Sequence, residues 1–316
     1  KRQGLNDPYS VYYTAEEYRK MMEQTSGTYS GIGALVSQNA ETGIITVVKA
    51  FADAPAAKAG VKNGDIIYKV KGKEVTGVDI NNVVTEMKGE KGTTVDITVY
   101  RESEKKYIDF TITRDQVNEP TVEYKMLDKK KKIGYTQISQ FEEVTYDQFT
   151  KALDDLKKQG MKAVIFDVRS NPGGLYETVC KMLDEILPEG NLVSTKDKYG
   201  NEEKQTSDSK CLDMPMVVLQ NKDSASASEI FAGAIQDFNA GKIVGTQSFG
   251  KGIVQTILPL SDGSAVKLTV QDYYTPSGKN IHGKGITPDV EAELEENATS
   301  DTQLEKAKET IMELMK

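Results

Sequence analysis

The sequence is poor in the residues on which disulfide, metal and histidine chemistry depend. Its 316 residues include two cysteines and a single histidine. Cys180 and Cys211 could pair, but two cysteines do not make a disulfide framework, and Cys180 lies in a helical apolar pattern that favours a buried thiol. Neither C-x-x-C, H-E-x-x-H nor a carboxylate-rich calcium loop occurs, so we expect no metal. A Ser-His-Asp triad has one possible centre, His282, which has no neighbouring acid in the sequence and is predicted to be a surface residue.

Long apolar runs and dense basic clusters are also missing. No stretch approaches the ~20 apolar residues of a membrane-spanning helix. With a net charge of −8 and no rich basic patch, we expect no nucleic-acid partner. The chain starts at Lys1 without a methionine or a signal peptide, so we expect that a natural signal or anchor has been removed. Membrane attachment would then depend only on that missing segment.

One stretch, residues 214–255, combines strand, helix and turn patterns in an order that can hold a nucleophile and a base. An apolar strand leads through a polar turn to serines spaced by alanines, a helix, a second strand and a glycine turn. In chain order these are Met214–Leu219, the serines Ser224, Ser226 and Ser228, Glu229–Phe238, Lys242–Val244 and Gly250-Lys251-Gly252.

Ser226 has two interpretations. With Glu229 it fits the S-x-x-E capping box, in which serine and glutamate cap the start of a helix. Alternatively, a serine at a helix start lies at the positive end of the helix dipole, where an alkoxide is favoured and nearby N–H groups can hold an oxyanion. A nucleophilic serine also needs a base.

Lys251 could supply that base. Most lysines are solvated surface charges, but burial lowers the pKa of an ammonium group and can leave the amine neutral. Gly245-x-x-x-x-Gly250-Lys251 also matches most of a phosphate-binding loop. That loop requires Ser or Thr next and then a helix, whereas Gly252 and a strand-like apolar run follow here. Nucleotide binding is therefore excluded.

The runs SASASEIFAGAIQD and VGTQSFGKGIVQ resemble the signature of the carboxyl-terminal processing proteases, which are tail-specific serine peptidases. The resemblance implies that Ser226 is the nucleophile and Lys251 the general base. Gln255, four residues after the lysine, would orient it. It also implies a peptidase that needs no cofactor.

The string DVRSNPGG, Asp167 to Gly174, ends a strand with nearly unbroken apolar character. Alone it predicts a glycine turn between a strand and a helix. It also resembles the family's oxyanion-hole turn, which implies that a glycine N–H and that of Ala227 hold the oxyanion. Either Gly173 or Gly174 could donate, and we favour Gly173.

Residues 31–114 show short alternating strands and glycine turns that resemble a PDZ domain. Gly31-Ile32-Gly33 is by itself a tight turn. The resemblance implies that its backbone N–H groups bind a peptide's terminal carboxylate, while the peptide adds as a strand to the neighbouring edge. A helix at Ile80–Met87 would form the other wall of the groove.

After Arg114 the sequence alternates apolar strands with helical patterns, which predicts an α/β core. We expect a crotonase/ClpP-like protease core with an inserted PDZ domain and flanking N- and C-terminal helices. The predicted parts are an N-terminal helical segment 1–28, a PDZ domain 29–114, a protease core 115–290 and a C-terminal helix 291–316.

These features predict a serine endopeptidase that cleaves protein or peptide substrates near their free C-termini and acts outside the cytoplasm. We also expect the empty PDZ groove to leave Ser226 and Lys251 too far apart for a hydrogen bond. The terminal helices suggest a homodimer. The alternatives are a catalytically inactive PDZ-type peptide-binding scaffold, a crotonase-like acyl-CoA enzyme and a hydrolase that depends on His282.

Overall fold

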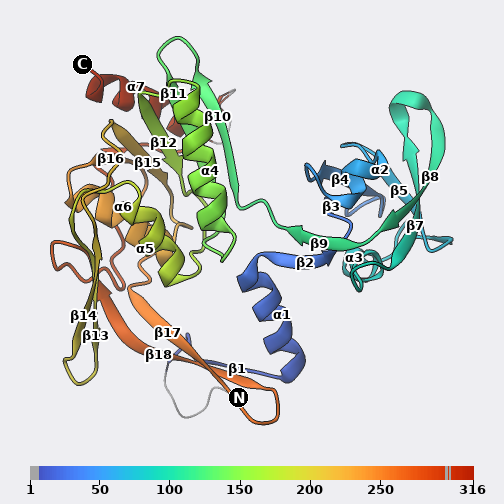
Figure 1. The fold of residues 1–316 in the computed structure, drawn as a ribbon, viewed down its shortest axis with the longest axis horizontal. Coiled ribbons are helices and arrows are strands. Elements are labelled where there is room, and N and C mark those ends of the chain that lie inside the picture. Colours follow the sequence, from blue (N-terminus) through green and yellow to red (C-terminus); the bar gives the residue numbers. More distant parts are fainter. Residues whose placement is uncertain (1–6, 296–297, 299) are drawn as a thin grey trace. The chain divides into compact units, whose positions relative to one another are not determined.

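The computed structural model describes residues 7–295, 298 and 300–316 and divides into two compact units (Figure 1). One unit joins residues up to Ser26 with Thr121–Lys316, and the other is Gly27–Pro120. The second unit is thus an insertion in the chain of the first. Residues 1–6 of the predicted N-terminal segment lie outside the described part.

The larger unit is built on a six-stranded sheet that is mostly parallel. Only its edge pair β10–β11 is antiparallel. Every residue of β12 and β15 is buried, as expected for parallel strands covered on both faces. The strands in sheet order are β10 (Val122–Asp128), β11 (Ile133–Ile138), β12 (Ala163–Asp167), β15 (Met216–Gln220), β16 (Gly241–Gly245) and β19 (Val290–Glu291).

Helices cover both faces of this sheet. Successive strand side chains point to opposite faces, so neighbouring residues of one strand pack against different helices. Val164 and Phe166 pack in the core formed with α4 (Thr145–Lys158), α5 (Tyr176–Asp184) and α6 (Ala227–Asp237). Ile165 points the other way and packs against α7 (Thr302–Leu314). This arrangement confirms the predicted α/β core.

Cys180 on α5 is buried in the first of these cores, and both cysteines are free. Among the described residues, no helix is both long enough and apolar enough to cross a membrane.

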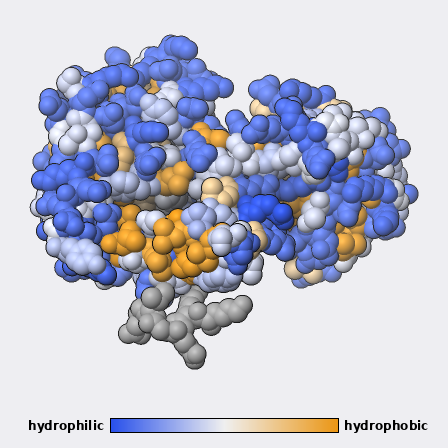
Figure 2. All heavy atoms as spheres, turned by 60° about the horizontal axis from the view of Figure 1, so that its bottom comes forward, coloured by the Kyte–Doolittle hydropathy of each residue, from blue (hydrophilic) through white to orange (hydrophobic). Residues whose placement is uncertain are grey.

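A second, antiparallel sheet lies beside this core in the same unit. Its strands are β1 (Val11–Tyr13), β18 (Ala265–Tyr274), β13 (Gly190–Asp197) and β14 (Glu202–Ser207), with β17 (Ile253–Pro259) also paired to β18. Figure 2 shows apolar side chains gathered on the side where β17 and β18 lie. The exposed apolar residues of this sheet include Tyr12 in β1, Leu258 in β17, Leu260 in the turn that follows β17, and Val270 in β18.

Helix α1 (Ala15–Ser26) follows β1 and starts with a capping box. The Thr14 N–H donates to the Glu17 carboxylate at 2.8 Å, and the Glu17 N–H donates to the Thr14 hydroxyl at 3.3 Å. These reciprocal bonds satisfy donors that the first helical turn would otherwise leave without partners.

The smaller unit contains a sheet in the order β3-β4-β5-β7-β8, with β6 paired to β5, so that β3 is an edge strand. The first and last strands of the smaller unit, β2 and β9, pair with each other. Beside this pair the Glu119 N–H donates to the Gly27 carbonyl at 2.7 Å. The elements are β2 (Thr28–Gly31), β3 (Ala34–Gln38), β4 (Ile45–Ala50), α2 (Pro55–Ala59), β5 (Ile66–Val70), β6 (Lys73–Glu74), α3 (Ile80–Met87), β7 (Thr94–Arg101), a 3₁₀ turn (Glu102–Glu104), β8 (Lys106–Thr113) and β9 (Asp115–Asn118).

A buried ion pair joins the loop before β5 to the end of β7 in the smaller unit. Arg101, at the end of β7, donates from Nε and Nη2 to the two carboxylate oxygens of Asp65, each at 2.8 Å. The side chains are 9% and 1% exposed. Removing one partner of such a pair leaves the other charge buried without compensation, which is costly.

Arg101→Met is therefore expected to destabilise the smaller unit by about 3–5 kcal/mol. The measurement is amide hydrogen exchange over residues 27–120 in the whole chain. The control is Lys91→Met, which removes a surface pair whose partners are 67% and 52% exposed. The control should cost less than about 1 kcal/mol. Equal protection in the two variants would contradict the expectation.

Candidate active site

The larger unit contains a cavity of about 1040 Å³. Its walls come from α1, β1, α5, α6, β17, β18 and the turn that follows β12. The structure brings five of the sequence-predicted residues to this one cavity. These are Gly173, Ser226, Ala227, Lys251 and Gln255.

Ser226 stands at the start of α6 in a strained backbone conformation, with φ 57° and ψ −115°. This left-handed φ is rare for a residue with a side chain, and such strain is concentrated at functional sites. A serine in a sharp turn between a strand and a helix is also the geometry of a nucleophile elbow.

The predicted capping box joins Ser226 and Glu229 at the start of α6. The Glu229 carboxylate accepts from the Ser226 N–H at 2.9 Å, as the motif requires. The Glu229 N–H also donates to the Ser226 carbonyl oxygen at 2.8 Å. The two residues that the S-x-x-E spacing pairs are therefore held together at this helix start.

Glu229 joins the serine to the lysine turn. Its side chain is fully buried. Oε2 accepts from the Ser226 N–H at 2.9 Å and from the Lys251 N–H at 2.8 Å. Oε1 accepts from the Gly250 N–H at 2.7 Å and from the Ser248 hydroxyl at 2.6 Å. One carboxylate thus fixes the backbones of both candidate catalytic residues.

Lys251 is half-buried at the cavity wall. Burial, with help from the positive charge of Lys267, lowers the pKa of the Lys251 amine, and the Glu229 carboxylate opposes this only in part. The amine lies 5.5 Å from the centre of the Tyr9 ring. A lowered pKa increases the fraction of neutral amine, the form that can accept a proton.

Gln255 contacts the same tyrosine. Its Nε2 donates to the Tyr9 carbonyl at 2.7 Å. Tyr9 is itself held by a turn in which its N–H donates to Asp7 Oδ1 at 3.0 Å. Within the described residues no hydrogen bond joins the Ser226 hydroxyl to the Lys251 amine. Sequence reasoning missed Tyr9, because its contacts with Gln255 and Lys251 span more than 240 positions in the chain.

The turn after β12 packs against the serine. The fully buried Asn171 accepts at its backbone carbonyl from the Ala225 N–H at 3.0 Å and from the Ser228 hydroxyl at 2.9 Å. A Cβ placed on Gly173 would lie 2.8 Å from the Ser226 Cβ. Together with its φ of 106°, this close approach requires glycine at position 173.

The two glycines of this turn differ in the use of their N–H groups. The Gly173 N–H donates to Asn171 Oδ1 at 2.8 Å. The Gly174 N–H has no hydrogen-bond acceptor in the described part of the chain. The donor favoured from sequence is therefore the one that already has a partner.

His282 is exposed on its glycine-rich loop, as predicted for a surface residue. Its ring lies edge-on to Tyr9, with ring centres 6.0 Å apart. Tyr273 is buried nearby, and its hydroxyl donates to the Ser226 carbonyl at 3.1 Å. Burial raises the pKa of Tyr273 well above its usual value, so this phenol stays protonated.

In the smaller unit, the predicted carboxylate-binding loop follows β2. Gly31 ends β2, and the backbone carbonyls of Ile32 and Gly33 accept from Ala56 at 2.7 Å and Phe51 at 3.0 Å. The N–H groups of Ile32 and Gly33 have no acceptor in the described part of the chain. Gly33 has φ 75°, and a Cβ there would lie 2.3 Å from that of Ala54.

Comparisons with known proteins agree with both units. The model of peptidase family S41 matches residues 132–292, and the model of the PDZ domain matches residues 30–112. The fold and these matches define a serine-type peptidase scaffold that carries a PDZ domain. The chain belongs to peptidase family S41, as the sequence resemblance implied.

Two curated relatives illustrate the match. A carboxy-terminal-processing protease of Bartonella bacilliformis is 41% identical over 295 residues, covering 91% of this chain and 67% of the relative. A probable CtpA-like serine protease of Staphylococcus epidermidis is 41% identical over 290 residues, covering 90% of this chain and 58% of the relative. The chain therefore spans about three fifths to two thirds of their lengths.

Solved structures also match. A photosystem II D1 C-terminal processing protease is 30% identical with a TM-score of 0.57, and the match covers 97% of this chain and 83% of that one. A putative S41 protease from Bacteroides fragilis has a TM-score of 0.62 at 16% identity, and the match covers 99% and 88% of the two chains. The second likeness concerns the fold alone.

Proposed function

We propose that this chain is a serine endopeptidase that cleaves protein substrates near their C-termini with a Ser226–Lys251 dyad. One observation carries the proposal. A strained serine at the start of α6 shares a cavity with a half-buried lysine whose pKa is lowered by burial. This combination supports the assignment of a nucleophile and its base.

In the proposed mechanism, neutral Lys251 takes the proton from the Ser226 hydroxyl as the oxygen attacks the scissile carbonyl carbon. Lys251 then returns this proton to the leaving amine, and water hydrolyses the acyl-enzyme. The Glu229 carboxylate holds the two backbones while the side chains react. Gln255 acts on the lysine through Tyr9, whose ring limits the positions open to the amine. No cofactor takes part.

We assign the oxyanion to the Ala227 N–H and to a glycine N–H of the turn after β12. Gly174 offers a donor without an acceptor. Gly173, which the sequence favoured, could donate only after releasing Asn171 Oδ1. Both glycines line the cavity next to Ser226, and this supports the turn as a whole as one side of the oxyanion hole.

The smaller unit is proposed to bind the substrate's C-terminus. Ile32 and Gly33 offer N–H groups to a carboxylate, and β3 has an open edge to which a peptide can add as a strand. We further propose that an occupied groove brings Ser226 and Lys251 into hydrogen-bond contact. The lack of such a bond in the described residues supports this form of gating.

Three sequence-based expectations stay predictions. They are the division at residues 28, 114 and 290, a homodimer through the terminal helices, and a location outside the cytoplasm. The first is consistent in outline with the inserted unit 27–120.

The test is a set of peptides that share one internal sequence and differ only at the C-terminus. A free carboxylate should be cleaved at least ~10-fold faster than the matching amide, because an amide cannot bind the loop as an anion. Ser226→Ala should leave both uncleaved. Equal rates for the two peptides would contradict the proposed role of the PDZ unit. Cleavage by Ser226→Ala would contradict the assignment of Ser226 as the nucleophile.

The inactive peptide-binding scaffold is the second candidate, and the peptide-binding features of the smaller unit support it equally. The desolvated Lys251 argues against it, since a scaffold gains nothing from burying an amine. Binding of the peptides without any cleavage by the wild type would favour this candidate. The crotonase-like enzyme would require acyl thioester binding, and the histidine hydrolase would require that His282→Ala abolish turnover.

A further inference from the structure

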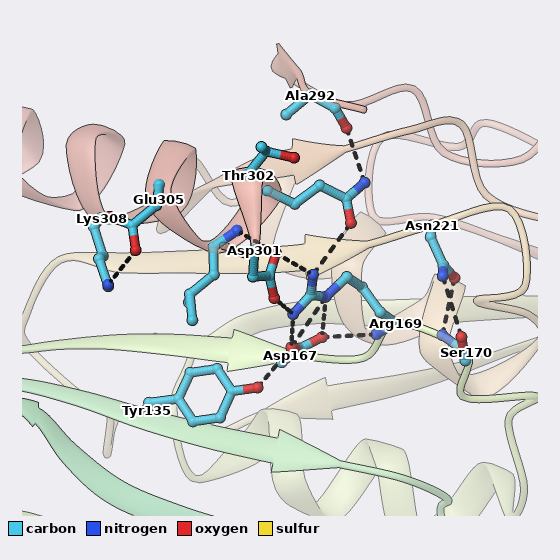
Figure 3. Close-up of polar contacts among 12 residues, drawn as sticks. Tyr135, Asp167, Arg169, Ser170, Asn221, Ala292, Asp301, Thr302, Glu305 and Lys308 are labelled. Atoms are coloured by element: carbon cyan, nitrogen blue, oxygen red, sulfur yellow. Dashed lines mark hydrogen bonds and ion pairs between the residues drawn. The ribbon is translucent and has the colours of Figure 1, made fainter. Parts of the chain in front are cut away.

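Arg169 lies between the strand β12 and the C-terminal helix α7, at the centre of a charged network (Figure 3). It follows β12 by two residues and directly precedes the turn 170–174 beside Ser226. The Arg169 guanidinium contacts a carboxylate on each side, Asp167 from β12 and Asp301 from α7.

On the strand side, Asp167 is 1% exposed, and both of its carboxylate oxygens accept hydrogen bonds. It accepts from the Tyr135 hydroxyl at 2.7 Å, from the Arg169 backbone N–H at 3.0 Å and from Arg169 Nη2 at 2.6 Å. These bonds fix the orientation of the guanidinium relative to the sheet. The other edge of the guanidinium remains for a partner from α7.

On the helix side, Asp301 has two functions. It is the N-cap of α7, where its Oδ1 accepts from the Leu304 N–H at 2.9 Å. Its two oxygens also accept from Arg169 Nη1 at 2.9 Å and Nη2 at 2.8 Å. Partial burial raises the pKa of Asp301, but the Arg169 guanidinium and the Leu304 N–H outweigh this and leave the pKa below its usual value. The carboxylate is therefore ionised at neutral pH.

The segment after Arg169 is under strain and needs to be held. Ser170 has φ 57°, and its N–H donates to Asn221 Oδ1 at 2.9 Å. Asn171 follows, and its carbonyl accepts from the Ala225 N–H and the Ser228 hydroxyl on either side of Ser226. A shift of Arg169 would move these residues and, with them, the glycines of the turn.

We propose that Asp301 is a positioning residue, which clamps Arg169 so that the turn 170–174 stays in place beside Ser226. This inference rests on the proposed function for its effect on turnover, but the clamp itself does not. It makes the C-terminal helix part of the active-site support. The docked helix would keep the glycine N–H groups aimed at the oxyanion.

Asp301→Asn tests the clamp, because asparagine caps helices as well as aspartate does but lacks the charge and the second acceptor oxygen. We expect the backbone amides of Ser170, Asn171 and Gly173 to exchange at least ~10-fold faster, with little change in the cores of α4 and β15. We also expect kcat to fall about 10-fold with KM unchanged, as for a displaced transition-state group. Asp301→Ser, which also caps, should behave alike.

The matched control is Glu305→Gln, which removes the exposed pair of Glu305 with Lys308 on the same helix (Figure 3). It should leave both exchange and kcat at wild-type values. Unchanged turn exchange in Asp301→Asn, or faster exchange spread evenly over the unit, would overturn the clamp. So would a higher KM at constant kcat. A wild type without Ser226-dependent cleavage would refute the proposed function, and the exchange data would still decide on the clamp.

Discussion

Replacing Lys251 with methionine is expected to lower kcat by about 10³- to 10⁴-fold while making the chain more stable. The loss follows from removal of the proposed general base, and such a group typically contributes about 10²- to 10⁴-fold. The gain follows because methionine fills a similar volume without a desolvated amine, and we expect roughly 1 kcal/mol. Peptide cleavage and chemical denaturation on the same preparation measure both effects. Turnover within 10-fold of wild type would contradict the assignment of the base.

Lys251→Arg is the matched control for charge. Arginine stays protonated at all accessible pH values, so this variant keeps the positive charge and loses the base. It should be as inactive as the methionine variant. A wild-type level of cleavage would mean that Lys251 acts only as a cation.

The lowered pKa of Lys251 also fixes the sign of two pH effects in the wild type. Cleavage should fall as the pH drops through this pKa, because the amine then becomes protonated. The unfolded chain, with the ordinary lysine pKa, binds more protons between the two values. Stability should therefore rise with pH through that window, and the Lys251→Met chain should lack this contribution.

Glu229→Gln is expected to lose at least ~100-fold in kcat and about 3 kcal/mol of stability. Glu229 accepts four hydrogen bonds, two on each oxygen. Glutamine would place an NH₂ group against two of these donors. If the NH₂ group faces the Ser226 and Lys251 N–H groups, these two backbones would separate or their N–H groups would remain buried without an acceptor. If it faces the other way, the Gly250 N–H would lose its acceptor.

Gln236→Ala provides the control for a general weakening of α6. Within the described residues the Gln236 side chain, at the far end of that helix, donates only to the Thr287 carbonyl. Its kcat should stay near the wild-type value. A Glu229→Gln chain that loses stability yet keeps its turnover would show that the carboxylate supports the fold and not the catalytic geometry.

Local sequence patterns were sufficient for the larger features. The nearly unbroken apolar run of β12 predicts a buried strand, and every residue of that strand is buried. The S-x-x-E spacing led to Ser226 and Glu229 together. The same spacing did not reveal that Glu229 also accepts from the Lys251 turn, since that contact depends on how the chain returns 22 residues later.

Other features of the structure could not be predicted from local sequence patterns. Strand β14 has the sequence EEKQTS and is almost wholly exposed, so it lacks the apolar alternation that marks a strand. The contact of Tyr9 with Lys251 and that of Arg169 with Asp301 join residues far apart in the chain. The Asn171 side chain accepts a hydrogen bond from the Gly173 N–H. This bond depends on the Asn171 rotamer and the local backbone conformation, which the sequence pattern does not predict.

The paired ends of the inserted unit have an evolutionary consequence. Because Gly27 and Glu119 are hydrogen-bonded neighbours, a gene segment for this unit can enter or leave by recombination without stretching the chain on either side. Such a cassette can diverge in sequence while the larger unit stays constant. Related enzymes could in this way acquire new targets by exchanging a recognition module.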